Sequence, residues 1–97
     1  DEVIDALVNT MNSDKNDNVR LAAINALSGM AAKNPRVKTE LIRALSVQEN
    51  SLLQISLIQV LTEMGAKEAR PEIEQIMNSD NADESVKKFA KDMIKVI

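Results

Sequence analysis

The chain has 97 residues and a formal net charge of −3, from 12 Lys and Arg against 15 Asp and Glu. It contains no His, Cys, Trp or Tyr, and only one Phe. This composition predicts one small helical domain and excludes disulfides, Cys/His zinc sites and Cys or His nucleophiles. The acidic balance argues against nucleic-acid binding. No apolar run reaches the ~18 residues expected of a membrane span, so no direct membrane insertion is predicted for this segment.

Hydrophobic periodicity predicts two helices in the first third of the chain. The first runs from about Asp1 to Asn12, and the second continues to about Lys33 after a polar turn. Asp17 or Asn18 is expected to cap the second helix. The residues predicted to point inward are Val3, Ile4, Leu7, Val8 and Met11, followed by Val19, Ala23, Ala26, Leu27 and Met30.

A second pair of helices is predicted after the break at Asn34-Pro35. One covers about residues 36–48, and the other begins at a cap on Asn50 or Ser51 and ends at Met64. Gly65 suits the end of a helix. The inward residues are Val37, Leu41, Ile42 and Leu45, followed by Leu53, Leu57, Val60, Leu61 and Met64.

The last pair of predicted helices covers residues 67–78 and about 83–97. Pro71 stands inside the first of them, so this helix either begins late, with Pro71 in its first turn, or is kinked there. The last helix is expected to bury Val86, Phe89, Ala90, Met93, Ile94 and Ile97.

One structural unit recurs three times along the chain. Residues 11–14 reappear letter for letter as residues 77–80, and a shift of 34 residues aligns the first two copies. A shift of 66 aligns the first and third copies as far as Asp80, and a shift of 67 aligns them afterwards. The units cover about residues 1–34, 35–66 and 67–97. Because none can bury its apolar stripe alone, they are predicted to stack into a solenoid.

The motifs resemble those of HEAT repeats. Residues 17–27 resemble the second helix of a HEAT unit: an Asp, then Val-Arg, then spaced alanines and Ala-Leu. Residues 69–77 resemble the first helix of the short HEAT-like units first grouped with phycobilisome lyases, and residues 84–90 resemble the second helix that follows. The middle unit departs from this pattern, with Ser51 for the Asp and Gln54 for the Arg.

The resemblance covers the whole chain and implies an all-α, right-handed α-α solenoid of three HEAT-like helical hairpins, with six helices. It implies one repeat domain over residues 1–97, which we expect to be a fragment of a longer protein. The implied role is non-catalytic: a protein–protein interaction, scaffold or regulatory domain that binds a partner segment on the concave face, which the second helices line.

Four apolar residues at matching positions in units one and two are candidates for partner contact. The alternative, which we favour, is that they pack between adjacent second helices. These residues are Leu21, Ile24, Ile55 and Ile58.

Lysines take the matching positions in the third unit, at Lys88 and Lys91, with Lys87 and Lys95 nearby. Because no further unit would cover the end of the stack, we expect these lysines to cap it. The alternative is contact with an acidic partner, phosphate or lipid head groups.

Charged residues near helix starts offer weaker candidates. We expect a helix cap and a charge pair at Asp17 with Arg20, and likewise at Glu84 with Lys87. A catalytic acid is less well supported there, because no base or nucleophile accompanies these residues. The acidic residues at the chain start suit the helix dipole. Asp14, Asn16 and Asp17 resemble part of a calcium loop but lack its Gly and its distal Glu. No metal or cofactor is therefore predicted.

The broad apolar stripe of the first helix predicts contact with more protein on that side, or dimerisation.

Two enzymatic roles found among proteins with HEAT-like repeats do not suit this chain. The iron-dependent hydroxylases need His, of which the chain has none, and the base-excision relatives need a basic, aromatic cleft, whereas this chain is acidic with one Phe. A bilin-lyase-like enzyme subunit has only the shared repeat in its favour. Another alternative is the extracytoplasmic distal domain of a bacterial, membrane-anchored anti-sigma-like regulator. The compartment, cytoplasmic or extracytoplasmic, stays open.

Overall fold

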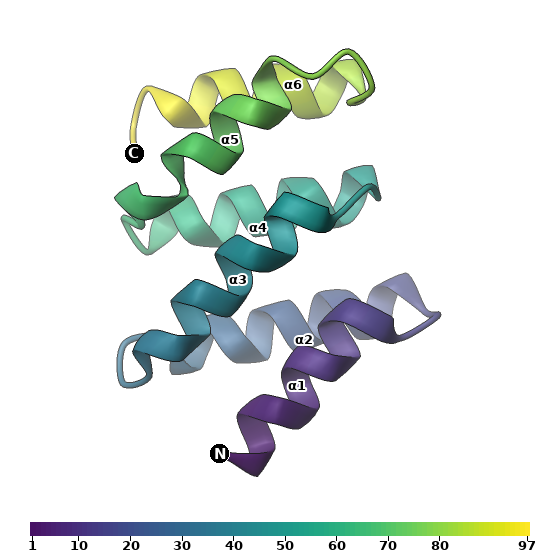
Figure 1. The fold of residues 1–97 in the computed structure, drawn as a ribbon, viewed down its shortest axis with the longest axis vertical. Coiled ribbons are helices and arrows are strands. Elements are labelled where there is room, and N and C mark those ends of the chain that lie inside the picture. The colour runs from purple at the N-terminus through teal and green to yellow at the C-terminus, as the bar shows by residue number, and fades with distance from the viewer.

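Six α-helices and one short 3-10 turn account for the fold in the computed structural model, which describes residues 1–97 and contains no strand (Figure 1). The predicted all-α class is therefore confirmed. The elements are α1 (Glu2–Ser13), α2 (Asp17–Met30), α3 (Pro35–Val47), α4 (Ser51–Glu63), η1 (Lys67–Ala69), α5 (Arg70–Met77) and α6 (Glu84–Ile94).

Short polar side chains begin most of the helices. Asp1 accepts hydrogen bonds from the backbone N–H groups of Val3 and Ile4, and thereby caps α1. Asn16, rather than the predicted Asp17 or Asn18, caps α2, because its Oδ1 accepts from the N–H groups two and three residues further on. Asn50 and Asp83 cap α4 and α6 in the same way. Each cap satisfies N–H groups that the helix itself leaves unpaired.

Proline and glycine residues mark several of the helix ends, because they restrict or widen the backbone angles available there. Helix α2 stops at Met30 rather than near Lys33, because a turn of longer hydrogen bonds, 3.3 to 3.4 Å, leads into the Asn34-Pro35 break. Gly65 follows Met64, the residue that caps the end of α4, and adopts a φ of 66°, a conformation that favours glycine. Pro71 lies in the first turn of α5, after η1, so the first of its two predicted alternatives is confirmed. Helix α6 ends at Ile94, before the predicted end at Ile97.

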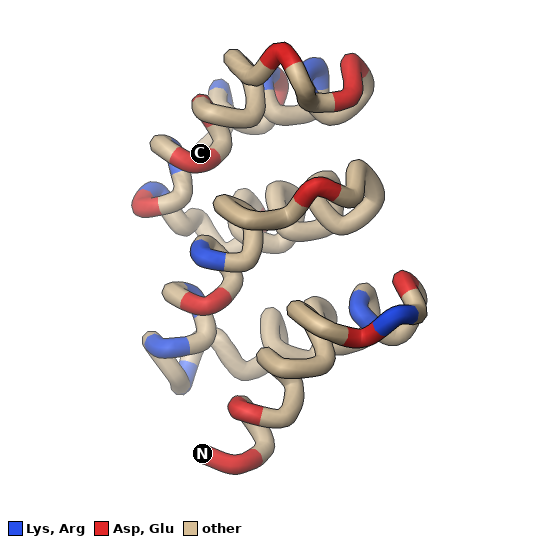
Figure 2. The backbone as a smooth tube through the Cα atoms, turned by 45° about the vertical axis from the view of Figure 1, so that its right-hand side comes forward, with Lys and Arg blue, Asp and Glu red and all other residues tan.

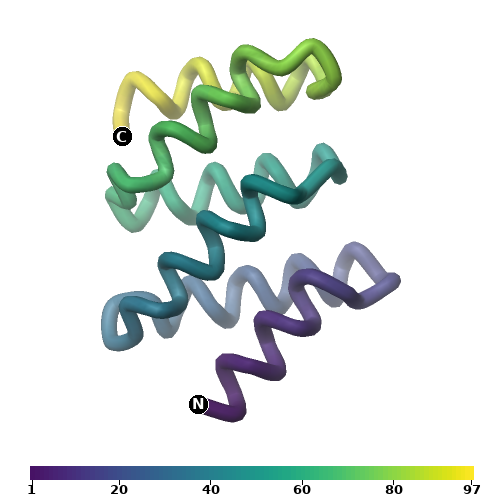
Figure 3. The backbone as a smooth tube through the Cα atoms, in the orientation of Figure 1, coloured from purple at the N-terminus to yellow at the C-terminus, as the bar shows by residue number.

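The helices form three pairs that follow one another along the longest dimension of the molecule, 36 Å (Figures 1 and 3). Within the pairs, α1 packs against α2, α3 against α4, and α5 against α6. Between the pairs, α3 contacts α1 and α5, while α4 contacts α2 and α6. The second helices, α2, α4 and α6, therefore lie in one row, and the first helices lie in another.

A single cluster of buried aliphatic side chains runs through all three pairs. Leu27, Leu41, Leu57 and Leu61 have no exposed surface, as predicted for inward residues. Three predicted inward residues are wrong: Val3 is 59% exposed, Val19 is 41% exposed, and Ala26 is also exposed. All three belong to the first pair of helices, on which no earlier pair packs.

Candidate functional site

The row of second helices presents one continuous outer surface, which we call the second-helix face. Each helix, counting the residue directly after α6, contributes four residues at spacings of three, four and three, the spacing of a single helical stripe. Every residue of this stripe is exposed or half-buried. The face consists of Asn18, Leu21, Asn25 and Ser28 on α2, of Leu52, Ile55, Gln59 and Thr62 on α4, and of Ser85, Lys88 and Asp92 on α6 with Lys95 directly after it.

The second-helix face changes character along the stack. Residues 21–32 and 51–62 contain no charged residue, and Figure 2 shows these stretches of α2 and α4 in tan. Leu52 is 50% exposed and shares its side of α4 with the half-buried Ile55. Helix α6, in contrast, adds Lys88 to the face, and Lys95 follows directly after it. The surface is therefore uncharged over two helices, where Leu21, Leu52 and Ile55 lie among polar side chains, and it carries two lysines and Asp92 at the third.

A cross-pair hydrogen bond holds the apolar part of this face together. The Asn50 side-chain amide donates to Oδ2 of Asp17 over 3.0 Å, which joins the start of α4 to the start of α2. Leu21 lies one helical turn after Asp17, and Leu52 lies two residues after Asn50. The bond therefore adds a polar contact between the two helices that carry the exposed apolar residues, whose packing rests on the shared core.

The candidate strip predicted from the sequence is only half available to a partner. Ile24 and Ile58 have no exposed surface and belong to the hydrophobic core, whereas Leu21 and Ile55 are half-buried against it. Three residues further along a helix advance about 300° around its axis, which turns Ile24 and Ile58 toward the interior. The four residues therefore do not form an open groove, and the burial of Ile24 and Ile58 agrees with the interpretation we favour, in which these residues are part of the packing.

Lysines stand on the surface at the matching positions of the third pair. Lys88 and Lys91 are both exposed. The residues that match Lys88 in the first two units, Leu21 and Ile55, are half-buried, and those that match Lys91, Ile24 and Ile58, are fully buried. The neighbouring Lys87 is less exposed and lies 3.6 Å from the Glu84 carboxylate, so this predicted pair is formed.

The predicted charge pair between Asp17 and Arg20 does not form. Nε of Arg20 donates instead to the backbone carbonyl of Met11 over 2.8 Å, at the end of the preceding helix. Gln54, which replaces this Arg in the second unit, donates over 2.9 Å to the carbonyl of Gln48. Both side chains therefore tie a second helix to the end of the first helix in the same pair, because helix ends leave carbonyls unpaired.

Two ion pairs that the sequence did not reveal connect successive pairs of helices. Arg36 on α3 lies 2.6 Å from Asp5 on α1, and its hydrogen bond and charge lower the pKa of the Asp5 carboxyl. Lys38 lies 2.9 Å from Glu68 in η1, and the hydrogen bond from this ammonium lowers the pKa of Glu68. All four side chains are more than a third exposed, so solvent screens both contacts.

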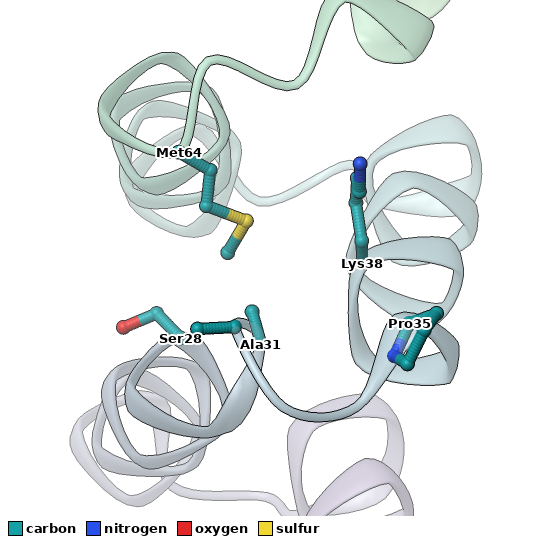
Figure 4. A pocket seen from close by; sticks show the side chains of 6 residues that line it. Ser28, Ala31, Pro35, Lys38 and Met64 are labelled. Atoms are coloured by element: carbon teal, nitrogen blue, oxygen red, sulfur yellow. The ribbon is translucent and has the colours of Figure 1, made fainter.

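A shallow open pocket of about 410 Å³ lies where α2 ends, α3 begins and α4 ends. In Figure 4, Met64 points into it from α4, Ala31 borders it from the end of α2, and Pro35 and Lys38 lie across from them. The Lys38 ammonium on its rim is engaged by Glu68. The pocket thus offers aliphatic surface, one paired cation and the Ser28 hydroxyl, which donates to the Asn25 carbonyl over 2.8 Å.

The residues that resemble part of a calcium loop bond to the backbone. Oδ1 of Asp14 accepts from the N–H of Asn16 over 2.8 Å, and Oδ1 of Asn16 caps α2. No group of three or more Asp and Glu side chains is placed to hold a metal ion. These short-range bonds are those of a turn that leads into a helix.

Comparisons with protein-family models, with curated proteins and with solved structures find no match to this chain. None of its helices has the length and apolar character needed to cross a membrane. The architecture therefore defines the class of protein as all-helical. The second-helix face is the surface that bears on a candidate function.

Proposed function

We propose that the chain is a non-catalytic protein-interaction module, built as a right-handed solenoid of three HEAT-like hairpins, that binds a partner segment along the second-helix face. The observation that carries the proposal is the exposed apolar area formed by Leu52 with the half-buried Ile55 and Leu21. It lies on a face that all three second helices share. Amphipathic helices and extended peptides commonly bind to such apolar surfaces between helices.

The chemistry of the face defines the partner. An apolar side chain of the partner would cover Leu52 and the exposed parts of Leu21 and Ile55, and this burial would supply most of the affinity. Lys88 on the next helix and Lys95 directly after it, with Asp92 between them, leave a net positive charge at this end of the face, which favours an acidic residue at one end of the bound segment. The partner segment we propose is therefore apolar at one end and acidic at the other.

Selection of random linear peptides against the purified chain tests this function. We expect the bound peptides to combine an apolar residue with acidic residues, and Leu52→Asp to weaken their binding at least about tenfold. Lys88→Glu should weaken binding of the same peptides and reduce or reverse the loss of binding with added salt, because an attractive contact to the acidic residues is replaced by a repulsive one.

The matched control is Val47→Asp, which places the same charge at a valine that is 70% exposed on α3, outside the second-helix face. Circular dichroism verifies that all variants are folded. If the peptides bind Leu52→Asp as tightly as the wild type, or if Val47→Asp weakens them equally, the second-helix face is not the binding surface.

A further inference from the structure

The first pair of helices exposes a face that the other two pairs bury. Val3 on α1 is 59% exposed, whereas the residues at the same repeat position, Val37 on α3 and Ala69 in η1, have no exposed surface. Leu7 is likewise half-buried, while Leu41 at its position is fully buried. The preceding pair of helices packs against α3 and α5, so these positions mark the side of a unit that receives its predecessor.

The second helices show the same difference. Val19 on α2 is 41% exposed, whereas Leu53 on α4 and Val86 on α6, at the same repeat position, have no exposed surface. Ala26 is exposed, while Val60 at its position is only 9% exposed. We call this surface of the first pair the leading face; it comprises Val3, Leu7 and Thr10 on α1, and Val19, Ala22 and Ala26 on α2.

The third pair of helices, at the opposite end, carries exposed lysines at the positions where a further pair would pack. At the positions where units one and two bury Ile24 and Ile58, the third unit exposes Lys91, and Lys88 stands where Leu21 and Ile55 are half-buried. Terminal units of repeat proteins need polar outer faces for solubility. One end of this stack is therefore polar where a neighbour would pack, and the leading face keeps aliphatic residues at the corresponding contact positions.

We infer that the leading face is the docking surface for one more helical hairpin of the same repeat type, stacked in register ahead of α1. The side of the added hairpin that faces α2 would carry aliphatic residues like Leu21 and Ile24, and these would pack against Val19, Ala22 and Ala26. The small alanines allow a helix to approach α2 closely, and burial of Val3 and Val19 would contribute to the contact. This contact is separate from partner binding at the second-helix face, and either can fail without the other.

A tandem extension of the full chain supplies the hairpin and tests the inference. A second copy of residues 1–34 is joined directly ahead of Asp1, which preserves the 34-residue register of the first two units. We expect one cooperative unfolding transition with Tm raised by at least about 5 °C. Amide hydrogen exchange in the original α2 should slow at least about tenfold, because a covered helix opens less often.

Matched variants in the original unit show whether the leading face is responsible. Ala26→Glu should leave Tm of the 97-residue chain within about 2 °C, because Ala26 is exposed, and should abolish the gain from the extension. Asn25→Glu, one residue away on the second-helix face, should leave the gain intact. Replacing Leu21 and Ile24 of the added copy with Lys, as at the lysine-bearing end, should also remove the gain.

Three results would overturn the inference. The first is an extension that neither raises Tm nor slows exchange in α2, and the second is a gain that survives Ala26→Glu. The third is a concentration-dependent dimer of the 97-residue chain in sedimentation that Ala26→Glu dissolves, since the leading face would then be occupied by a second copy.

Discussion

Leu27→Ala and Leu61→Ala should each lower the free energy of unfolding by about 2–5 kcal/mol. Both leucines have no exposed surface and lie in the one core cluster that runs through all three pairs. Each substitution removes buried apolar atoms and leaves a cavity that the neighbouring helices fill only in part. For a small domain, whose total stability is often only ~5–15 kcal/mol, this is a large fraction.

Urea unfolding followed by circular dichroism measures this loss. Leu52→Ala is the matched control, because Leu52 is 50% exposed on α4, and it should change stability by no more than about 1 kcal/mol. If Leu27→Ala and Leu61→Ala prove as mild as Leu52→Ala, the inward residues of α2 and α4 are assigned incorrectly.

Ile58→Glu should unfold the chain at neutral pH. Ile58 has no exposed surface and belongs to the hydrophobic core, so the substitution places a carboxylate among apolar side chains. The cost of burying an unpaired charge is several kcal/mol, to which the lost burial of the isoleucine is added. The sum is comparable to the whole stability of a domain of this size.

Lys91→Glu makes the same new side chain at the same repeat position of α6, where the residue is exposed. Far-ultraviolet circular dichroism should show a helical Lys91→Glu variant and an unfolded Ile58→Glu variant at the same temperature. A helical Ile58→Glu variant with wild-type Tm would mean that Ile58 is accessible to solvent after all, and the four-residue strip would again be a candidate groove.

Much of the fold follows from patterns that are local in the sequence. The 3.6-residue periodicity, the break at Pro35 and the glycine at position 65 predict six helices and most of their ends, because each depends on backbone geometry within a few residues. The cap of α2 was misplaced because Asn16, Asp17 and Asn18 are all good capping residues. Only the turn geometry, in which Asp14 binds the N–H of Asn16, decides among them.

Burial was harder to predict where it depends on a neighbouring unit. Val19 and Ala26 lie on the apolar stripe of α2, and the same positions in α4 are buried by the preceding pair. Periodicity describes one helix and cannot tell whether a second one covers it. Burial of Ile24 and Ile58 has the same origin, since the helix that covers them is distant in sequence.

Side-chain contacts across units were the least predictable part of the candidate site. Asp17 was expected to pair with Arg20 one turn away, and instead accepts from Asn50 in the next unit. Asp5 with Arg36 and Lys38 with Glu68 are separated by about thirty residues, and nothing local marks them as partners. Exposed charged side chains have many alternative positions of similar energy, so only the packed helices select among them.

Thiol labelling of single-cysteine variants tests the central claim, that burial follows position in the repeat and order in the stack. The chain has no cysteine, so a single Val→Cys substitution introduces the only thiol. Two comparisons are made between equivalent repeat positions, one exposed and one buried: position 3 with position 37, and position 19 with position 86. We predict that the cysteines at positions 3 and 19 react within about tenfold of the unfolded chain, and that those at 37 and 86 react at least about 100-fold more slowly. Similar labelling rates within each pair would contradict the stacking on which both proposals rest.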